Sequence, residues 1–423
     1  MLRVPLVQAK PGMKLALPVL HKERPDTMLL RAGFELDDRA LTRLRDMQLP
    51  ELWIEYPSLS FIEKHISPQI VGARGQLQRV LATLFDRLNR DASAQLEYPE
   101  YKRTIHDLVQ KLLDEPDAAF FITEMSNGNK PLMRHSADVA FLSLLMGLKL
   151  DAYLINQRRR LKAHRAKDVV GLGVAALLHD IGLLFIEAEV LDRFLESGDE
   201  SDPKFRQHVK LGYDKLQSGL DPAAANAVLN HHQHYDGSGF PRRRDEKGRA
   251  VGLAGEQIHI FSRILTVADL YDRFRNPPGA SSPAPAVVAL NKLRTPPISH
   301  WIDPTVFKAL LAVAPAYPPG AVVTLSNGER CAVVGWTAAD PCRPTVQVLE
   351  EEGAESDEWD RPVKRYALSE RRDLTVVSVD GVPTEEHNFY PSHSLEFHLD
   401  LGASGDPEAQ PAIADSAAGP RAA

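Results

Sequence analysis

Residues 169–182 read VVGLGVAALLHDIG. The first ten are uncharged and include two glycines, a length that suits a buried helix better than a membrane span, which needs about 20 apolar residues. The run ends on His179 and Asp180, whose side chains can ligate divalent metals. Ile181 and Gly182 then stop the helix. This stretch predicts a metal-ligand pair delivered by a buried helix.

The pattern from residue 125 to residue 315 is almost wholly helical and contains nearly all the other candidate ligands, which stand at helix ends or at the edges of apolar faces: His135, His208, His231, His232 and Asp269. A lone histidine on an apolar face is more often a hydrogen-bonded core residue than a ligand. Burying five histidines and two aspartates in one domain without a metal or partner would, however, be strongly unfavourable. The cluster therefore favours a metal centre.

The N-terminal flank divides into two parts. Residues 1–66 mix short β-type runs with one helical stretch at 37–47, which predicts a small α+β module that could sense or regulate. Residues 67–124 predict linker helices, the first with Leu77, Leu81, Leu84 and Leu88 in a heptad-like stripe. An ordinary amphipathic helix is favoured over a dimerising coiled coil, because one or two heptads do not sustain a coiled coil.

In the C-terminal flank the sequence pattern changes from the helical period to a period of two residues, which is typical of β-strands. Residues 316–400 predict a small antiparallel β region, with a hairpin turn at Asn327-Gly328. The acidic run 350–358 is interpreted as a solvated loop. Residues 401–423 are rich in Ala, Gly, Pro and Ser and are expected to be a disordered tail.

Composition limits the class of protein. The 423 residues are 43% hydrophobic and 25% charged, as in globular proteins, and are long enough for two to four domains. A net charge of −7 argues against binding a nucleic acid polymer through bulk charge. The two cysteines, Cys331 and Cys342, exclude a disulfide framework and indicate a reducing, cytoplasmic setting. We expect neither a signal peptide nor a membrane span.

Four motifs together resemble the HD-GYP family: Arg134-His135-Ser136, the segment 178–182, the block from His231 to Pro241, and the segment 267–272. This family is a branch of the HD metal-dependent phosphohydrolases and hydrolyses the bacterial second messenger cyclic di-GMP. The similarity spans roughly residues 125–315. Segments 10–13 and 317–320 also resemble regions that accompany this domain. The resemblance implies a mainly α fold with a helical HD-type core.

The resemblance also implies site residues. One metal would be bound by His135, His179, Asp180 and Asp269, and the other by Asp180, His208, His231 and His232. Asp180 would bridge two divalent ions, iron or manganese. Asp180 and Asp236 are the expected catalytic residues, and the expected substrate-binding residues are Gly237, Gly239, Phe240, Pro241 and Arg273. His234 is a weaker catalytic candidate, because a histidine near a polar loop is more often solvated.

Several positions depart from the family pattern. Leu183 stands where the family carries Lys, Gln233 replaces Glu, and Phe240 replaces Tyr. Pro131 stands where some members have a Glu that holds a third metal, so two metals are the expected maximum. Residues 273–278 replace a stretch that grips the substrate phosphates. Restoring the cation with Leu183→Lys is therefore expected to raise turnover.

Three functions are compatible with these residues and with the resemblance. The favoured one is a phosphodiesterase that converts cyclic di-GMP to the linear dinucleotide pGpG or to GMP. Its activity would be reduced, since losing a phosphate-binding group costs about 1.5–3 kcal/mol, which slows an enzyme without abolishing its activity. The alternative is an inactive protein that binds cyclic di-GMP or a signalling partner such as a diguanylate cyclase. A general HD nucleotide phosphohydrolase is weaker, because the 236–241 block is particular to the cyclic dinucleotide branch. A homodimer is compatible with each.

Overall fold

The apolar stretch forms helix α8, Val170–Leu178, and seven of its nine residues are buried. It contacts helices on several sides, namely α3, α5, α11 and α12. Gly173 permits this packing, because a Cβ there would lie 2.6 Å from Ile105 Cγ2 and 2.8 Å from Leu144 Cδ2. A helix enclosed in this way is apolar all round, as the sequence indicated.

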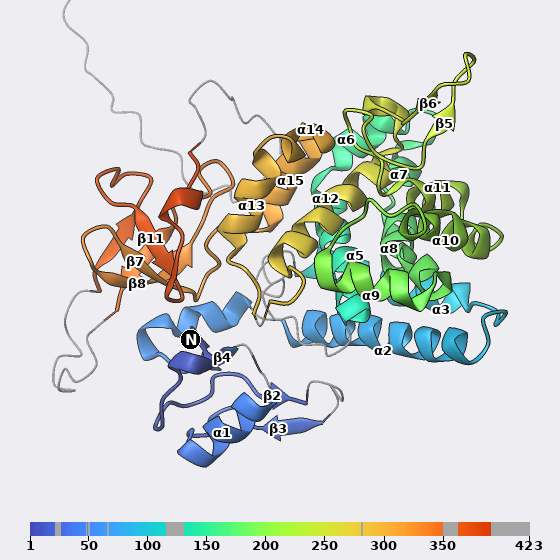
Figure 1. Cartoon of the computed structure of the whole chain (residues 1–423). Helices are drawn as coiled ribbons and strands as arrows, with labels where there is room; N and C mark the ends of the chain where they lie inside the picture. The colour runs from blue at the N-terminus through green and yellow to red at the C-terminus, as the bar shows by residue number, and fades with distance from the viewer. Residues whose placement is uncertain are drawn as a thin grey trace, which may run out of the picture. The chain divides into compact units, whose positions relative to one another are not determined.

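The computed structural model describes residues 1–21, 27–47, 49, 51–65, 67–115, 131–280, 282–349 and 363–390. Within residues 131–313 the other helices are α5 (Pro131–Lys149), α6 (Asp151–Gln157), α7 (Ala163–Ala166), α9 (Ala188–Ser197), α10 (His208–Leu216), α11 (Pro222–Asn230), α12 (Ile260–Arg275), α13 (Ala286–Arg294), α14 (Ile298–Trp301) and α15 (Pro304–Val313) (Figure 1). Short 3-10 turns cover Ile181–Phe185 and Phe205–Gln207, and a small hairpin pairs β5 (Arg243–Arg244) with β6 (Ala250–Val251). The predicted mainly α fold is confirmed.

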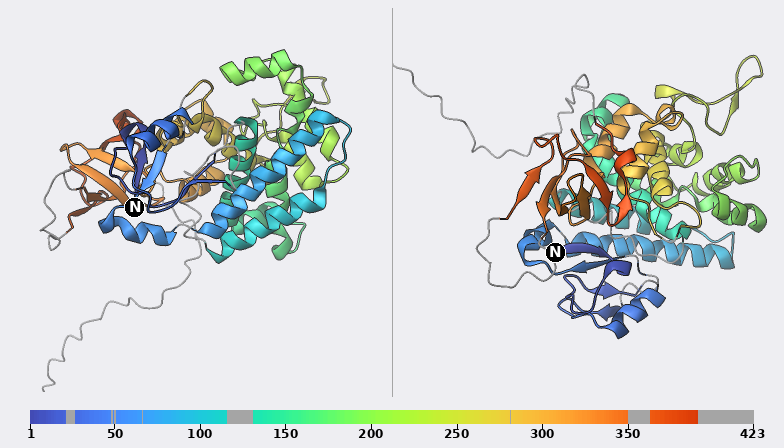
Figure 2. Two further views of the ribbon diagram at one scale, coloured as in Figure 1. Left: turned by 90° about the horizontal axis from the view of Figure 1, so that it is seen from below. Right: turned by 60° about the vertical axis from the view of Figure 1, so that its left-hand side comes forward.

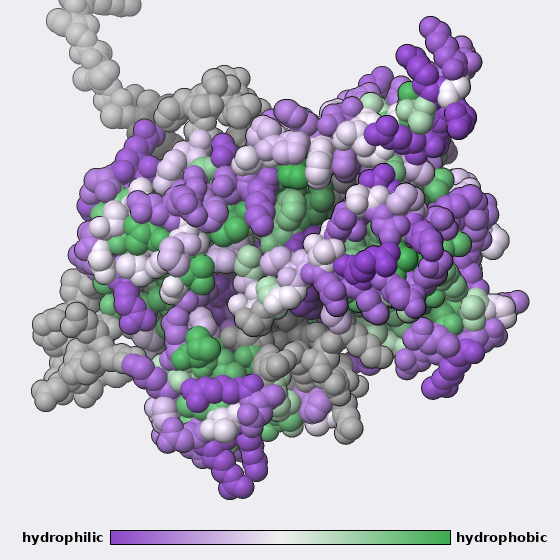
Figure 3. Space-filling view, viewed as in Figure 1, coloured by the Kyte–Doolittle hydropathy of each residue, from purple (hydrophilic) through white to green (hydrophobic). Residues whose placement is uncertain are grey.

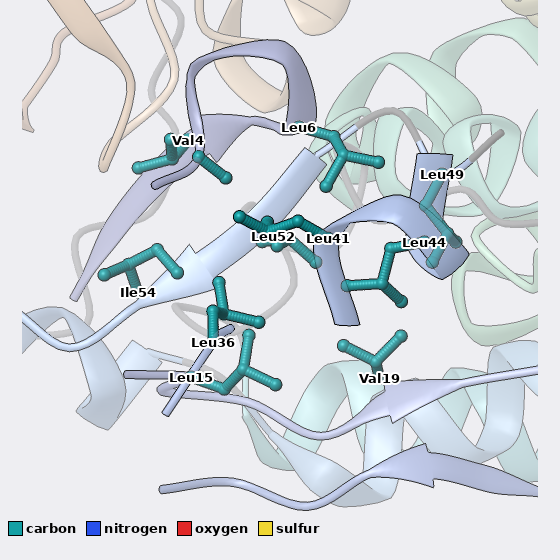
Figure 4. Close-up of a cluster of buried hydrophobic side chains, with 11 residues drawn as sticks. Val4, Leu6, Leu15, Val19, Leu36, Leu41, Leu44, Leu49, Leu52 and Ile54 are labelled. Carbon is teal, nitrogen blue, oxygen red and sulfur yellow. The ribbon is translucent and has the colours of Figure 1, made fainter. Parts of the chain in front are cut away.

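The described residues of the N-terminal module form two antiparallel strand pairs and one α-helix. Strand β1 (Leu2–Pro5) pairs with β4 (Glu51–Ile54), and β2 (Val19–Leu20) pairs with β3 (Met28–Leu30). Helix α1 (Asp38–Asp46) begins where the Asp37 side chain accepts a hydrogen bond from the Ala40 amide at 2.6 Å. Figure 4 shows the leucine-rich cluster that the helix and the strands bury together.

The linker helices are α2 (Pro68–Arg90) and α3 (Tyr98–Asp114), which lie side by side (Figure 2). The α2 stripe of Leu77, Leu81, Leu84 and Leu88 is buried, and α2 contacts α3 and α5. The stripe therefore packs within the chain, as an ordinary amphipathic helix does. The remainder of the expected linker, residues 116–124, lies outside the described residues.

The C-terminal region is a six-stranded antiparallel sheet in the order β10-β9-β8-β7-β11-β12. Its strands are β7 (Val322–Leu325), β8 (Arg330–Gly335), β9 (Thr345–Val348), β10 (Arg365–Ala367), β11 (Val376–Val379) and β12 (Val382–Pro383). The predicted hairpin joins β7 to β8, with Gly328 at φ +86°. The acidic run 350–358 and the tail 401–423 lie outside the described residues.

The N-terminal module and the C-terminal sheet contact one another directly. The Arg3 guanidinium donates to Asp380 Oδ2 at 2.6 Å, and the Arg3 amide donates to the Gly320 carbonyl at 2.8 Å. A second link joins Gln347 Nε2 to Ser58 Oγ at 2.8 Å. The two ends of the described chain therefore support each other, although they lie more than 300 residues apart.

By length and composition, one helical stretch among the described residues could cross a membrane: Ala163–Phe185, with a mean hydropathy of 1.7. Its most apolar part is 72% buried inside the protein and includes α8, as expected for a core helix. The face of the molecule in Figure 3 is largely hydrophilic, with hydrophobic residues in small groups.

Candidate metal centre

All seven predicted ligands converge in the helical part of the chain and are buried. They come from separate elements: His135 from α5, His179 and Asp180 from the end of α8, His208 from the start of α10, His231 and His232 from the end of α11, and Asp269 from α12. Their ligand atoms form two groups, each with its atoms within 4.8 Å of one another. One group is His135, His179 and Asp269, and the other is Asp180, His208, His231 and His232.

The Asp180 carboxylate lies between the two groups. Its Oδ1 is 3.5 Å from His208 Nε2 and 3.5 Å from His231 Nε2. Its Oδ2 is 3.4 Å from His179 Nε2 and 3.6 Å from His135 Nε2. Each oxygen thus faces a different pair of rings, which is the arrangement that a bridging carboxylate needs.

Hydrogen bonds fix the orientation of the histidine rings. In three of them Nδ1 donates to a backbone carbonyl three residues earlier: His179 to Ala176 at 2.8 Å, His208 to Phe205 at 2.7 Å and His231 to Val228 at 2.7 Å. These rings follow or begin helical turns, and the last turn of a helix leaves carbonyl groups without intrahelical partners. Because a carbonyl can only accept, each Nδ1 carries a proton, which leaves Nε2 as the ring nitrogen that can face a metal.

Carboxylates orient the other two rings. Asp272 Oδ2 lies 2.7 Å from His135 Nδ1, and Glu200 Oε2 lies 3.3 Å from His232 Nδ1. Metal-binding histidines usually have such a partner, which sets both the tautomer and the ring orientation. Sequence reasoning gave no role to either carboxylate. Asp272 could have been found as the residue one helical turn after Asp269, whereas the loop residue Glu200 carries no sequence signal.

The inward-facing atoms fit divalent cations. His179 Nε2, His232 Nε2 and Asp180 Oδ1 are buried without a hydrogen-bond partner among the described residues. Two ring nitrogens also face each other, since His208 Nε2 lies 3.5 Å from His231 Nε2. Buried polar atoms without hydrogen-bond partners are unfavourable unless another group, such as a cation, binds them. Imidazole and carboxylate groups are suitable ligands for iron, manganese or zinc.

Electrostatics keep most of these groups in the ligand form. Burial lowers the pKa of His208 to about 4, and burial together with His231 and Arg273 lowers the pKa of His232 well below its usual value. Burial alone would raise the pKa of Asp180, but the neighbouring His179 and His231 more than offset this and hold it well below the usual range.

The pKa of His135 shifts in the opposite direction to those of His208 and His232. Burial lowers its pKa, but hydrogen bonds to Asp269 and Asp272 outweigh this and raise the pKa to about 10. Its Nε2 lies 3.0 Å from Asp269 Oδ1. A proton therefore holds this pair together when no metal is bound.

The 236–241 loop contains residues with different roles. The Asp236 side chain is exposed and accepts a hydrogen bond from the Ser238 amide at 2.8 Å, which forms a turn. Gly239 allows close backbone packing, since a Cβ there would lie 2.3 Å from the His232 carbonyl oxygen. Phe240 stacks on His232 with ring centroids 4.5 Å apart. Phe240 therefore supports a predicted ligand ring.

A cavity of about 1150 Å³ opens over the cluster. Its wall includes five of the seven expected catalytic and substrate-binding residues, Asp180, Asp236, Gly239, Phe240 and Arg273, but neither Gly237 nor Pro241. Sequence reasoning missed several of its polar and aromatic wall residues, among them Arg134, Arg206 and Trp301. Trp301 stacks on His234, with ring centroids 4.3 Å apart and planes 10° apart.

Two departures from the family pattern have structural explanations. Leu183 is 1% exposed and packs in an apolar cluster with Val190 and Phe205. The expectation that a lysine there would raise turnover is therefore not supported, because its charge would be buried among apolar side chains. The buried Gln233 donates from Nε2 to the Pro241 carbonyl at 2.5 Å and accepts from the Leu253 amide at 3.0 Å. Its amide braces the loop.

Arg273 points into the ligand cluster. Its Nε donates to Asp269 Oδ1 at 2.7 Å, its Nη1 contacts Glu200, and its Nη2 lies 3.8 Å from Asp180 Oδ2. Burial opposes its charge, but Asp269, Glu200 and Asp180 more than compensate and raise the pKa of Arg273. Arg273 is therefore a permanent cation beside the predicted ligands.

Part of the chain matches a known protein family. Residues 152–306 match the HD domain family, so this part of the chain is similar to HD domains. Six of the seven predicted ligands lie within the match, and His135 precedes it. The resemblance to the HD-GYP family is confirmed.

Curated relatives cover the chain to different extents. The cyclic di-GMP phosphodiesterase PA4108 of Pseudomonas aeruginosa is 25% identical over 82% of this chain and 84% of its own length. The cyclic di-GMP phosphodiesterase response regulator RpfG of Xanthomonas campestris pv. campestris is 34% identical over 25% of this chain and 26% of its own. The 3'3'-cGAMP-specific phosphodiesterase 3 of Vibrio cholerae is 32% identical over 34% of this chain and 29% of its own.

A solved structure was also found. Bd1817, an HDG"Y"P protein from Bdellovibrio bacteriovorus, is 17% identical, with a TM-score of 0.41 over 73% of this chain and 97% of that one.

Proposed function

We propose that this chain is a metal-dependent phosphodiesterase that hydrolyses cyclic di-GMP. The observation that carries the proposal is the position of Asp180, whose two oxygens face two separate groups of buried ligand atoms beneath the cavity. Relatives named as phosphodiesterases for cyclic dinucleotides support the substrate class.

The proposed cofactors are two divalent ions, iron or manganese, held by the seven predicted ligands. When bound, such ions polarise a phosphoryl oxygen and activate water at neutral pH. The chain contributes imidazoles whose orientation is fixed by hydrogen bonds at Nδ1, and the Asp180 carboxylate, which is held ionised. These groups are positioned in the fold before substrate arrives, which is the basis of electrostatic preorganisation.

Other cavity residues suit a nucleotide phosphodiester. Arg206 lies over the Phe240 ring at 4.9 Å, and its Nε donates to the Glu200 carbonyl at 2.8 Å, so its guanidinium is held at the cavity wall. Arg134 also lines the cavity. We propose that these arginines bind the phosphates in place of the missing family stretch. The Trp301 ring offers a flat surface on which a guanine base can stack.

The competing function is a protein that binds cyclic di-GMP or a signalling partner without hydrolysing it. The inward orientation of Arg273 favours this alternative, because its contacts with Asp269 and Glu200 divert it from the substrate. Turnover distinguishes the two functions, whereas metal content does not. We further propose that the protein is cytoplasmic, that the product is the linear dinucleotide or GMP, and that the chain forms a homodimer.

The test is anaerobic purification with iron or manganese, followed by a time course on cyclic di-GMP and on 3'3'-cGAMP. We expect slow formation of the linear dinucleotide or GMP, and a higher KM in Arg206→Gln. The matched control is Arg243→Gln, an exposed arginine of β5 that is not part of the cavity wall. Bound metal and bound dinucleotide without any product would reject the enzyme in favour of the binding protein.

A further inference from the structure

Arg273 is anchored against one half of the ligand cluster. Its Nε bonds Asp269 Oδ1 at 2.7 Å, its Nη1 contacts Glu200, and its guanidinium lies over the Phe194 ring at 5.1 Å. The remaining guanidinium nitrogen, Nη2, is buried without a hydrogen-bond partner among the described residues and lies 3.8 Å from Asp180 Oδ2. Three elements, α9, α12 and the loop before η4 (Phe205–Gln207), therefore hold one charged side chain in place.

The oxygen that Arg273 contacts is the one that a metal in this half would need. Asp269 Oδ1 lies 3.0 Å from His135 Nε2 and 3.9 Å from His179 Nε2, so it completes the first ligand group. A divalent ion bound there would share this oxygen with a guanidinium. Two cations at such close range in a buried site repel each other strongly, because water does not screen them.

The second ligand group lacks such a competitor among the described residues. Its four members are Asp180, His208, His231 and His232, and Arg273 approaches Asp180 through Oδ2 rather than through Oδ1. Oδ1 is the oxygen that faces His208 and His231. The Glu200 carboxylate contacts both the Arg273 guanidinium and His232 Nδ1, so it lies between these two side chains.

From these contacts we infer that the two metal positions differ in their affinity for a divalent ion. The Arg273 guanidinium occupies the ligand group formed by His135, His179 and Asp269 and lowers its affinity. A divalent ion binds firmly only to Asp180, His208, His231 and His232. A second ion enters the other half in competition with the guanidinium, which must withdraw from Asp269. This inference rests on the proposed metal-dependent function and specifies which position is filled first.

Metal titration tests the inference without any assay of hydrolysis. The full chain, stripped of metal by a chelator, is titrated with Mn²⁺ while free Mn²⁺ is followed by electron paramagnetic resonance. We expect one tight and one weak site in the native chain. Arg273→Gln should tighten the second site at least tenfold. The matched control is Arg275→Gln, which removes the same charge from the same helix and should leave both sites unchanged.

Two additions guard against a variant that fails to fold. Arg273→Lys keeps the charge but cannot span Asp269 and Glu200 together, so its second-site affinity should fall between those of the native chain and Arg273→Gln. Thermal melting should show Arg273→Gln with a lower midpoint than the native chain without metal, and with a larger rise on adding Mn²⁺.

The outcomes separate the two proposals. Two equal sites in the native chain, or an unchanged second site in both Arg273 variants, overturn the inference and leave the proposed phosphodiesterase standing. Unequal sites without hydrolysis of either dinucleotide support the inference and reject the phosphodiesterase. Absence of Mn²⁺ binding in every variant rejects both.

Discussion

Asp272 accepts a hydrogen bond from His135 Nδ1 at 2.7 Å, so a carboxylate one helical turn beyond Asp269 orients another predicted ligand. Replacing Asp272 by Ala should lower the affinity of the first ligand group for Mn²⁺ by about 10–100-fold, the usual effect of removing such a partner. Metal titration measures this change. Asn276→Ala serves as the control, because Asn276 contacts Asp272 through Oδ1 rather than through the oxygen that faces His135. Equal losses in both variants would contradict the orienting role.

The bridging position of Asp180 gives a second prediction. Asp180→Ala should reduce bound metal toward zero rather than by half, because both ligand groups lose an oxygen. Titration with Mn²⁺ to saturation measures the metal bound at both sites. Asp236→Ala is the control, since that carboxylate forms a turn with Ser238 and lies outside both ligand groups. An Asp180→Ala protein that retains half its metal would show that Asp180 serves only one ion.

The sequence predicted the elements whose signals are local. The apolar run before His179 forms α8, the helical stretch at 37–47 forms α1, and the Asn327-Gly328 turn joins β7 to β8. It missed β1, β5, β6, β10 and β12, which are each two to four residues long. β1 pairs with β4 almost 50 residues away, and such a distant partner leaves no local pattern.

The site shows the same division. The seven predicted ligands could be named because the motif residues occur in a recognisable order along the chain. Glu200 and Arg273 could not be placed, since their roles depend on how a loop folds against α12. The buried position of Leu183 likewise follows from packing against Val190 and Phe205, which sequence order does not reveal.

Gln233 uses both halves of its amide, which predicts the effect of introducing the family's Glu. In Gln233→Glu the donor to the Pro241 carbonyl is lost and a charge is buried. The free energy of unfolding should fall by about 1–3 kcal/mol, as measured by urea denaturation. Gln257→Glu makes the same change at an exposed residue whose side-chain oxygen accepts from Ala254, and should have little effect. Equal stability of both variants would argue against the bracing role.

Leu183→Lys should reduce stability without increasing turnover. The side chain is 1% exposed beside Val190 and Phe205, so a lysine must bury its ammonium group or displace the cluster. We expect a loss of roughly 2–4 kcal/mol in the free energy of unfolding. Leu183→Met, which conserves volume and polarity, should cost less than about 1.5 kcal/mol. Faster hydrolysis by a stably folded Leu183→Lys protein would restore the original expectation from the family pattern.

The helix that carries Asp269 and Asp272 begins at a histidine, and this predicts a pH dependence of stability. His259 Nδ1 accepts a hydrogen bond from the Phe261 amide at 3.2 Å, so the cap requires the neutral ring. Burial, assisted by Arg158 and Arg263, lowers the pKa of His259 to about 4, whereas the unfolded value is near 6.5. The unfolded state binds the proton more tightly, so the stability contributed by His259 is complete above about pH 6.5 and is lost as the pH falls toward 4. At pH 5 the loss should be about 2 kcal/mol.

His259→Asn can still cap the helix but cannot titrate. Urea denaturation at pH 7 and pH 5 should therefore show a smaller decrease in stability for the variant, and equal decreases would reject the role of the His259 cap.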